Sequence, residues 1–247
     1  MAKGRLDTIL LERGLTSSRE RARALIMAGQ VVVDDHLADK AGQIVDIGAE
    51  IRLKGEILPF VSRGGLKLRK ALDEFAIDVT DLVVMDVGAS TGGFTDCLLQ
   101  RGAARVIAVD VGYGQLAWKL RSDERVINME KTNIRYLEPA KLKETPQMAV
   151  IDASFISLGK VLPSVLNLIS PSAIVVALIK PQFEVGRGEV GKGGVVRDGR
   201  KHLEVISTIT SLAVDLKLEV KGVTESPVLG PKGNKEFLIY LVKTDTE

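Results

Sequence analysis

An apolar run that ends in a glycine-rich turn is the feature that most constrains this 247-residue chain. The run at 82–85 leads into Asp86-Val-Gly-Ala-Ser-Thr-Gly-Gly-Phe-Thr-Asp96, after which residues 97–99 continue at helical spacing. A strand, a glycine-rich turn and a helix in this order bring bare backbone close to a nucleotide-like ligand. The pattern therefore predicts an α/β sheet with a ligand-binding loop after one of its strands.

A second acid follows this loop at a spacing suited to ribose recognition. Asp110 ends the apolar run 106–109, where its carboxylate can accept hydrogen bonds from ribose hydroxyls. The glycine spacing differs from the dinucleotide pattern G-x-G-x-x-G, which favours S-adenosylmethionine as the ligand. The predicted cofactor-binding residues are Asp86, Gly88, Ala89, Ser90, Thr91, Gly92, Gly93, Phe94, Asp110 and Val111. The alternative is an ordinary glycine turn, with Asp110 merely ending a strand.

The basic residues gather in two segments, although the net charge is only +2. Residues 1–33 hold six basic side chains against three acids, and residues 62–70 hold four basic side chains and no acid. Basic groups on one face attract phosphates, and aromatic residues at 4% are too scarce for base stacking to dominate. The predicted RNA-binding residues are Lys3, Arg5, Arg19, Arg23 and Arg63. The alternative is a solvated helix face with ordinary surface arginines.

Cysteine usage and hydropathy indicate a cytoplasmic protein. The single cysteine, Cys97, excludes an internal disulfide and fits a reducing compartment. No apolar run approaches the ~20 residues needed to cross a bilayer, so no membrane partner is expected. His36 and His202 are isolated, and no metal site is predicted.

Two domains are expected, with a boundary near the linker 58–61. Residues 1–60 predict helices at 5–13 and 19–28 and short strands at 30–33, 44–46 and 50–53, a small α+β module. Residues 61–247 predict a doubly wound sheet with helices on both faces. Its expected strands are 82–87, 105–110, 125–129, 148–152, 173–180, 217–224 and 236–243. Its expected helices are near 66–76, 94–101, 114–121, 158–169 and 200–213.

The first domain resembles the alpha-L RNA-binding motif named after ribosomal protein S four. The matching residues are Arg5-Leu6-Asp7, Ser18-Arg19, Ala24-Leu25-Ile26, Gly29-Gln-Val-Val-Val33 and Gly48-Ala-Glu-Ile51. The resemblance implies that this domain binds RNA.

Four polar residues stand at or near the carboxyl ends of strands, where a doubly wound sheet places its ligands. Asp152 and Lys180 follow the ends of strands, whereas Lys67 begins the helix before the first strand and Glu236 enters the last strand. Methyl transfer to a ribose hydroxyl needs alignment and removal of the hydroxyl proton. A lysine can take that proton once burial and a nearby positive charge favour its neutral form. We predict Lys180 as the base and Lys67 as the nearby charge. Asp152 would orient Lys180 and the donor methyl, and Glu236 would hold Lys67 or the ribose.

Other patterns narrow the reaction. Cys97 lies inside a predicted helix and is expected to be buried and inert, which argues against a cysteine nucleophile. Asp152-Ala-Ser-Phe155 stands where exocyclic-amine methylases carry Asn-Pro-Pro-Tyr. Trp118 is expected to pack in a helix. The glycine-rich segment 185–199 predicts either a flexible connector or a lid over the substrate.

Nearly the whole chain resembles the TlyA (hemolysin A) family of ribosomal RNA 2′-O-methyltransferases, which have an FtsJ-like catalytic domain. The matching residues are 62–68, 86–96, 109–116, 152–155, 179–184 and 235–237. The resemblance implies a Rossmann-like S-adenosylmethionine-dependent fold, a catalytic tetrad at Lys67, Asp152, Lys180 and Glu236, and cytidine targets in ribosomal RNA or ribosomal subunits. Two alternatives are a haemolytic, membrane-active protein and a ribosome-assembly factor without catalysis. The oligomeric state is not predicted.

Overall fold

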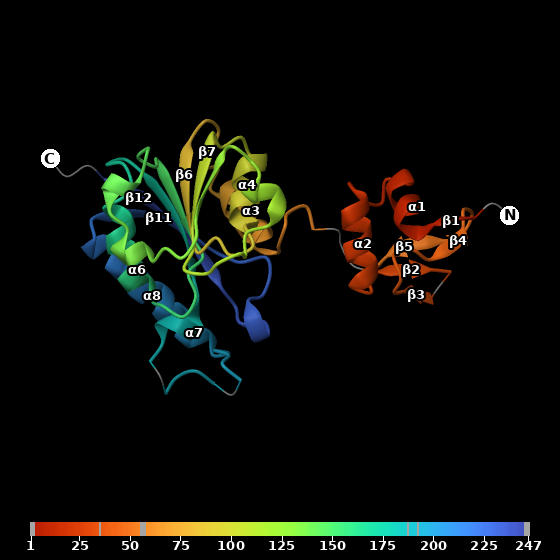
Figure 1. The fold of residues 1–247 in the computed structure, drawn as a ribbon. Helices are drawn as coiled ribbons and strands as arrows, with labels where there is room; N and C mark the ends of the chain where they lie inside the picture. Colours follow the sequence, from red (N-terminus) through yellow and green to blue (C-terminus); the bar gives the residue numbers. More distant parts are fainter. Residues whose placement is uncertain (1–2, 35, 55–57, 187, 192, 245–247) are drawn as a thin grey trace. The chain divides into compact units, whose positions relative to one another are not determined.

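The computed structural model describes residues 3–34, 36–54, 58–186, 188–191 and 193–244. They fall in two units, residues 1–58 and 59–247 (Figure 1). In the part of the chain that the structure describes, no helix is long and apolar enough to cross a bilayer.

The described residues of the N-terminal unit form two helices and two small antiparallel sheets. Ser18 caps the second helix, because its Oγ accepts a hydrogen bond from the backbone N–H of Arg21 at 3.1 Å. Leu6, Leu10 and Ile26 are fully buried in the core of this unit. Its elements are β1 (Lys3–Arg5), α1 (Leu6–Glu12), α2 (Arg19–Met27), β2 (Val31–Val33), β3 (His36–Ala38), β4 (Ile44–Asp46) and β5 (Ile51–Leu53).

The C-terminal unit is built on one seven-stranded sheet with the order β11-β12-β10-β9-β6-β7-β8. β12 runs antiparallel to both of its neighbours, whereas the other pairs along the sheet are parallel. The strands are β6 (Val83–Val87), β7 (Arg105–Val109), β8 (Val126–Met129), β9 (Met148–Ile151), β10 (Ile174–Ile179), β11 (Leu218–Glu225) and β12 (Phe237–Lys243).

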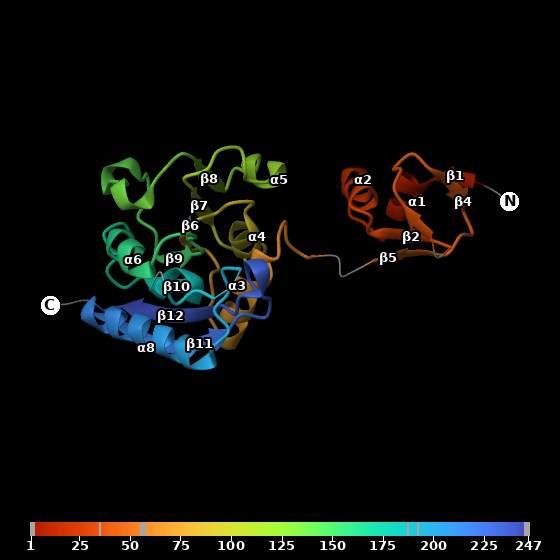
Figure 2. The ribbon, with the colours of Figure 1, turned by 90° about the horizontal axis from the view of Figure 1, so that it is seen from below.

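Helices cover both faces of this sheet, as the sequence predicts. α6 and α8 pack on one face and α3 and α4 on the other (Figures 1 and 2). The interior strand β10 therefore points its side chains alternately into the two cores. Because both of its faces are buried, its sequence is a continuous apolar run. The helices are α3 (Gly64–Glu74), α4 (Gly93–Gln100), α5 (Trp118–Arg121), α6 (Leu158–Leu166), α7 (Pro181–Glu184) and α8 (Gly199–Asp215), with 3₁₀ turns at Ile134–Tyr136, Pro139–Lys141 and Pro231–Gly233.

The region around Trp118 differs from the prediction. α5 begins at Trp118 rather than at 114, because Gly114 takes a left-handed φ of +69° that a helix does not continue from. The Trp118 side chain is 78% exposed, so the expectation that it packs in a helix is wrong.

Candidate active site

The polar residues of the predicted site meet at the carboxyl edge of the sheet, and the reversed strand β12 explains how Glu236 joins them. In the antiparallel register of β10 and β12, Phe237 lies opposite Ile179. Lys180 therefore leaves the end of β10 at the point where Glu236 precedes the start of β12. Asp152 follows β9, the parallel neighbour of β10 on its other side. Glu236, which precedes β12, therefore lies at the same edge of the sheet as Asp152 and Lys180, which follow β9 and β10.

Two ion pairs form at this edge, one of them buried and the other with a carboxylate, Asp152, that is 22% exposed. Lys67, on α3, places Nζ 2.6 Å from Oε2 of Glu236. Lys180 places Nζ 2.5 Å from Oδ1 of Asp152. Glu236, Lys180 and Lys67 are all buried, with Glu236 fully inaccessible. Each cation has one carboxylate, which offsets the cost of burying both charges. The expected positive charge of Lys67 is therefore balanced by Glu236.

Two further polar side chains hold these pairs, and neither was predicted. Ser154 Oγ accepts a hydrogen bond from Lys180 Nζ at 2.8 Å. Gln182 donates through Nε2 to the second oxygen of Glu236 at 3.3 Å. Both residues follow the ends of strands, as Asp152 and Lys180 do. Their place at the carboxyl edge was the signal that could have identified them.

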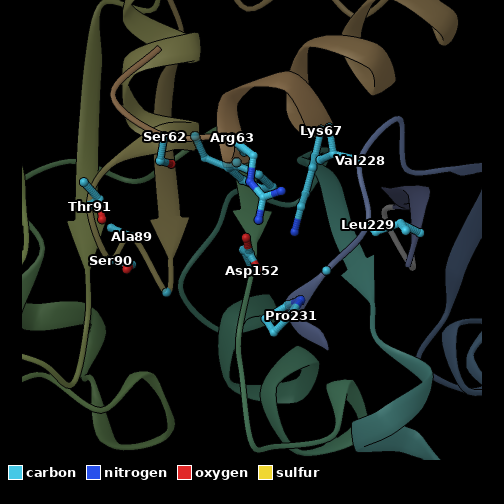
Figure 3. A pocket seen from close by; sticks show the side chains of 15 residues that line it. Ser62, Arg63, Lys67, Ala89, Ser90, Thr91, Asp152, Val228, Leu229 and Pro231 are labelled. Carbon is cyan, nitrogen blue, oxygen red and sulfur yellow. The ribbon is translucent and has the colours of Figure 1, made fainter. Parts of the chain in front are cut away.

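A cavity of about 390 Å³ opens beside Lys67 and the glycine loop. Figure 3 shows the side chains of Arg63, which precedes α3, and of Lys67, on α3, pointing toward Asp152. Arg63, predicted from its charge to bind RNA, thus lines the same cavity as Lys67 and Asp152, one member of each ion pair. Of the predicted cofactor residues, this cavity is lined by Gly88, Ala89, Ser90, Thr91, Gly93 and Phe94.

A second cavity, of about 450 Å³, shares Gly88, Ser90 and Asp152 with the first. Asp110 and Val111 line it, together with Thr132, Asn133 and residues 153–156. The Asp110 carboxylate accepts hydrogen bonds from the backbone N–H groups of Ser90 (2.8 Å) and Gly112 (2.7 Å). Each of its oxygens retains a further lone pair for an incoming hydroxyl.

Gly88 allows the two cavities to meet. Its φ is +84°, and a Cβ atom added there would lie 2.7 Å from the carbonyl oxygen of Asp152. Only glycine fits this approach of two backbones. The bare loop, the acid at Asp110 and the adjoining hollows fit a ligand that carries a ribose and a charged tail.

Two of the predicted cofactor residues lie outside the cavity walls. Gly92 precedes α4 in a left-handed conformation, against Leu116 and Leu120. Asp86 is fully buried beneath the loop, and Thr95 donates to its Oδ2 at 2.6 Å. Its Oδ1 has no hydrogen-bond partner among the described residues. Burial, the largest cause, raises the pKa of Asp86 to about 7.

Cys97 is fully buried in α4. Burial raises the pKa of its thiol to about 12. A thiol in this environment is a poor nucleophile, as expected from its place in the helix.

Phe155 is the most exposed large apolar side chain near the site. The residue is 90% exposed and its φ is +64°, an unfavourable conformation for an aromatic residue. The ring packs on Phe183 at 5.1 Å between centroids, and Lys180 Nζ lies 5.9 Å from the centre of the Phe183 ring. The strained backbone therefore holds an open aromatic surface beside Lys180.

The glycine-rich segment 185–199 is described except at residues 187 and 192. Asn234, which is buried, bonds the backbone of Val196 at 3.1 Å and of Gly194 at 3.0 Å. The later part of the segment is therefore anchored to the body of the C-terminal unit.

In the N-terminal unit, three of the predicted RNA-binding arginines meet at one carboxylate. Arg5, Arg19 and Arg23 all donate to Asp7, which is fully buried. Lys3 is exposed in β1. The structure thus gathers the arginines of β1 and α2 around an acid that the sequence did not single out.

Two family models match the chain. One described as FtsJ-like methyltransferase matches residues 60–243, and one described as S4 domain matches residues 4–51.

Full-length relatives agree with these matches. YqxC of Bacillus subtilis, provisionally named an rRNA methyltransferase, is 51% identical over 97% of this chain and 85% of its own length. The 16S/23S rRNA (cytidine-2′-O)-methyltransferase TlyA of Mycobacterium tuberculosis is 46% identical over 99% of this chain and 91% of its own length. A solved Streptococcus thermophilus structure with a provisional hemolysin name is 50% identical, with a TM-score of 0.77 and coverage of 100% of this chain and 90% of that one. The chain therefore belongs to the FtsJ-like methyltransferase family and, within it, to the group with an N-terminal S4 domain that includes TlyA.

Proposed function

We propose that the protein transfers a methyl group from S-adenosylmethionine to the ribose 2′-hydroxyl of a cytidine in ribosomal RNA. The observation that carries the proposal is the Lys180–Asp152 pair, in which the lysine is buried and the carboxylate lines both cavities beside the glycine loop. Family membership and the activity printed for TlyA support the substrate class.

Lys180 is the group that removes the hydroxyl proton. It accepts that proton once its own ammonium proton has been released to solvent, and Asp152, 2.5 Å away, stabilises the ammonium that results. Ser154 Oγ accepts a second hydrogen of the same ammonium at 2.8 Å. These two contacts fix the direction in which Nζ can meet the hydroxyl. The cofactor supplies an electrophilic methyl group.

Lys67 forms part of the wall of the reaction cavity, and Glu236 holds it from behind. Gln182 holds Glu236, and Glu236 holds Lys67. Lys67 lines the cavity as a fixed donor and can bind the ribose or a neighbouring phosphate. Position, rather than charge alone, is its contribution to alignment.

The cofactor is assigned to the second cavity and the loop above it. Asp110 would accept the ribose hydroxyls, and Val111 would cover the adenine beside Thr132 and Asn133. Gly88 lets the charged tail pass close to Asp152. Asp86 supports the loop from below, through Thr95 at the start of α4.

The RNA partner is assigned to the basic residues of both units. The S4 match and the group Lys3, Arg5, Arg19, Arg23 and Arg63 support binding of ribosomal RNA, naked or within ribosomal subunits. A cytoplasmic location follows from this partner.

The test is methyl transfer from labelled S-adenosylmethionine to small subunits, large subunits and naked ribosomal RNA, followed by mapping of the modified ribose. We expect label on a cytidine 2′-oxygen. Label on protein, on a base or on a small molecule would overturn the proposal. Leakage of dye from liposomes treated with the purified protein would support the membrane-active alternative instead.

A further inference from the structure

Asp7 of α1 accepts hydrogen bonds from three arginines, although one cation would balance the charge of its carboxylate. Arg5 donates to it through Nε and a terminal nitrogen, both at 3.0 Å. Arg19 and Arg23 each donate through Nε at 3.1 Å. Hydrogen bonding, from Arg5 above all, holds the pKa of Asp7 well below its usual range, so the carboxylate stays ionised. One buried negative charge therefore accepts hydrogen bonds from three positive ones, and even with the exposed Glu20 beside Arg19 and Arg23 the cluster keeps a net positive charge.

The surplus charge is turned toward solvent. The side chains of Arg5, Arg19 and Arg23 are 44%, 44% and 50% exposed, while that of Asp7 is 0% exposed. Arg19 and Arg23 contact Asp7 through Nε alone, and this contact leaves their terminal nitrogens for other acceptors. A guanidinium anchored by its inner edge presents the outer edge as a fork that matches phosphate oxygens.

The cluster exists only in the folded unit. Arg5 ends β1, Asp7 lies in the first turn of α1, Arg19 begins α2, and Arg23 follows one turn later on the same face. Three elements thus supply one site. A group of arginines that merely decorated the surface would not need a shared buried acid.

We infer that Asp7 organises Arg5, Arg19 and Arg23 into a binding site for a phosphate group of the RNA backbone. The inference rests on the RNA substrate proposed above. The site reads no base, because phosphate contacts position a protein on nucleic acid without reporting sequence. Asp7 is a positioning residue that acts through the three arginines.

The inference predicts that neutralising Asp7 weakens RNA binding, the opposite of what the change in net charge alone would do. Neutralising Asp7 adds one positive charge to the unit, which by attraction alone tightens RNA binding. Without Asp7, three like charges repel one another and three long side chains must be ordered at the moment of binding. We expect this loss of order to exceed the gain in charge.

The first test compares Asp7→Asn with Glu12→Gln in the full chain. Glu12 is exposed at the end of α1, so its substitution adds the same charge without touching the arginines. Binding of a labelled RNA hairpin is measured over a range of salt concentrations. We expect Asp7→Asn to weaken binding about tenfold and lower the salt slope by about one or two phosphates, and Glu12→Gln to bind at least as tightly as wild type. Equal binding by the two variants would overturn the inference.

The second test does not depend on the Asn variant folding. Arg19→Lys and Arg23→Lys keep the charge and remove the Nε–H that each arginine donates to Asp7. We expect each to weaken hairpin binding about fivefold, with far-UV circular dichroism unchanged. Wild-type affinity in both would overturn the inference.

A third measurement separates this inference from the proposed function. In ¹⁵N spectra, the Nε–H protons of Arg19 and Arg23 should exchange slowly with water, and titration with inorganic phosphate should shift them in wild type. Fast exchange in wild type, or no shift with phosphate, would count against the site. These readouts need no methyl transfer, so an inactive enzyme with protected, phosphate-responsive arginines would reject the proposed reaction alone.

Discussion

The two units bury charge in opposite ways. In the C-terminal unit each buried lysine has one carboxylate, as in Lys67–Glu236 and Lys180–Asp152. In the N-terminal unit one buried carboxylate, Asp7, lies under three half-exposed arginines. A buried lysine that has one carboxylate partner carries no net charge into the protein interior. Such a pair suits the transfer of a single proton. An unbalanced cluster leaves positive charge at the surface, where a polyanion can use it.

Two inaccessible acids sharpen this contrast. Asp7 and Asp86 are both fully buried. Arginine hydrogen bonds keep the pKa of Asp7 low, whereas desolvation raises the pKa of Asp86 to about 7. The difference lies in the partners, because Asp86 has a threonine hydroxyl where Asp7 has three cations. Burial alone therefore does not decide the ionisation of an acid.

The largest expected effect concerns the pair that acts on the substrate. Lys180→Ala should lower single-turnover methyl transfer roughly a thousandfold, since a positioned general base contributes about 10²–10⁴. Binding of S-adenosylmethionine, measured by calorimetry, should persist. Lys160→Ala, an exposed lysine of α6, is the matched control. Near-normal turnover of Lys180→Ala would show that the Lys180–Asp152 pair does not remove the hydroxyl proton.

The next effect is the pH dependence of stability that Asp86 creates. Its pKa is raised from 3.8 to about 7, so between these values the folded protein keeps a proton that the unfolded chain loses. Its stabilising contribution is complete below about pH 4 and falls as the pH rises to about 7. Asp86→Asn removes this dependence of the unfolding free energy on pH, because the amide does not titrate. The unfolding free energy of the variant relative to wild type should therefore rise by about 4 kcal/mol between about pH 4 and pH 8.

Urea denaturation at a series of pH values measures this difference. Asp78→Asn, an exposed acid before β6, serves as the control because its pKa is lowered rather than raised. A relative stability of Asp86→Asn that stays flat with pH would show that Asp86 is ionised when buried.

A smaller effect is expected from breaking a balanced pair. Glu236→Gln leaves Lys67 buried without its counter-charge, and loss of one partner of a buried pair costs about 3–5 kcal/mol. The retained amide makes the lower end of this range the expected value. Glu204→Gln, on the exposed side of α8, should change the unfolding free energy little. A Glu236→Gln protein as stable as that control would mean that Lys67 finds another acceptor.

The smallest effect is expected in the unbalanced cluster. Arg23→Ala removes one of three cations from Asp7 and leaves Arg5 and Arg19 in place. Because Arg23 is half exposed, its pair is screened, and the unfolding free energy should fall by at most about 1 kcal/mol. Thermal melts of the full chain measure it. A loss as large as that of Glu236→Gln would erase the contrast between the two units.

Much of the fold could be predicted because its signals are local. The strands expected to end at 87, 110, 152 and 180 end at 87, 109, 151 and 179, because each apolar run is bounded by a turn or a polar residue. The carboxyl-edge rule then gathers Asp152 and Lys180. Strands β1 and β3 were missed, since three residues are too few to show a period. The length of α5 was overestimated because the conformation of Gly114 is not visible in composition.

The pairing within the site was harder to predict. Lys67 and Glu236 are 169 residues apart and meet only because β12 runs backwards beside β10. The part played by Asp7 depends on the packing of β1 and α2 around α1, which periodicity does not report. Long-range partners of charged residues come from topology, whereas their candidate positions come from the sequence.

The burial of Cys97 has a practical consequence. The chain has one cysteine, and that thiol is inaccessible with a pKa of about 12. Maleimide dyes should therefore leave the native protein unlabelled. A cysteine introduced at an exposed position would become the sole attachment point without prior removal of the native one. Fluorescent reporters can thus be placed beside Asp7 or beside Phe155 in an otherwise unmodified enzyme.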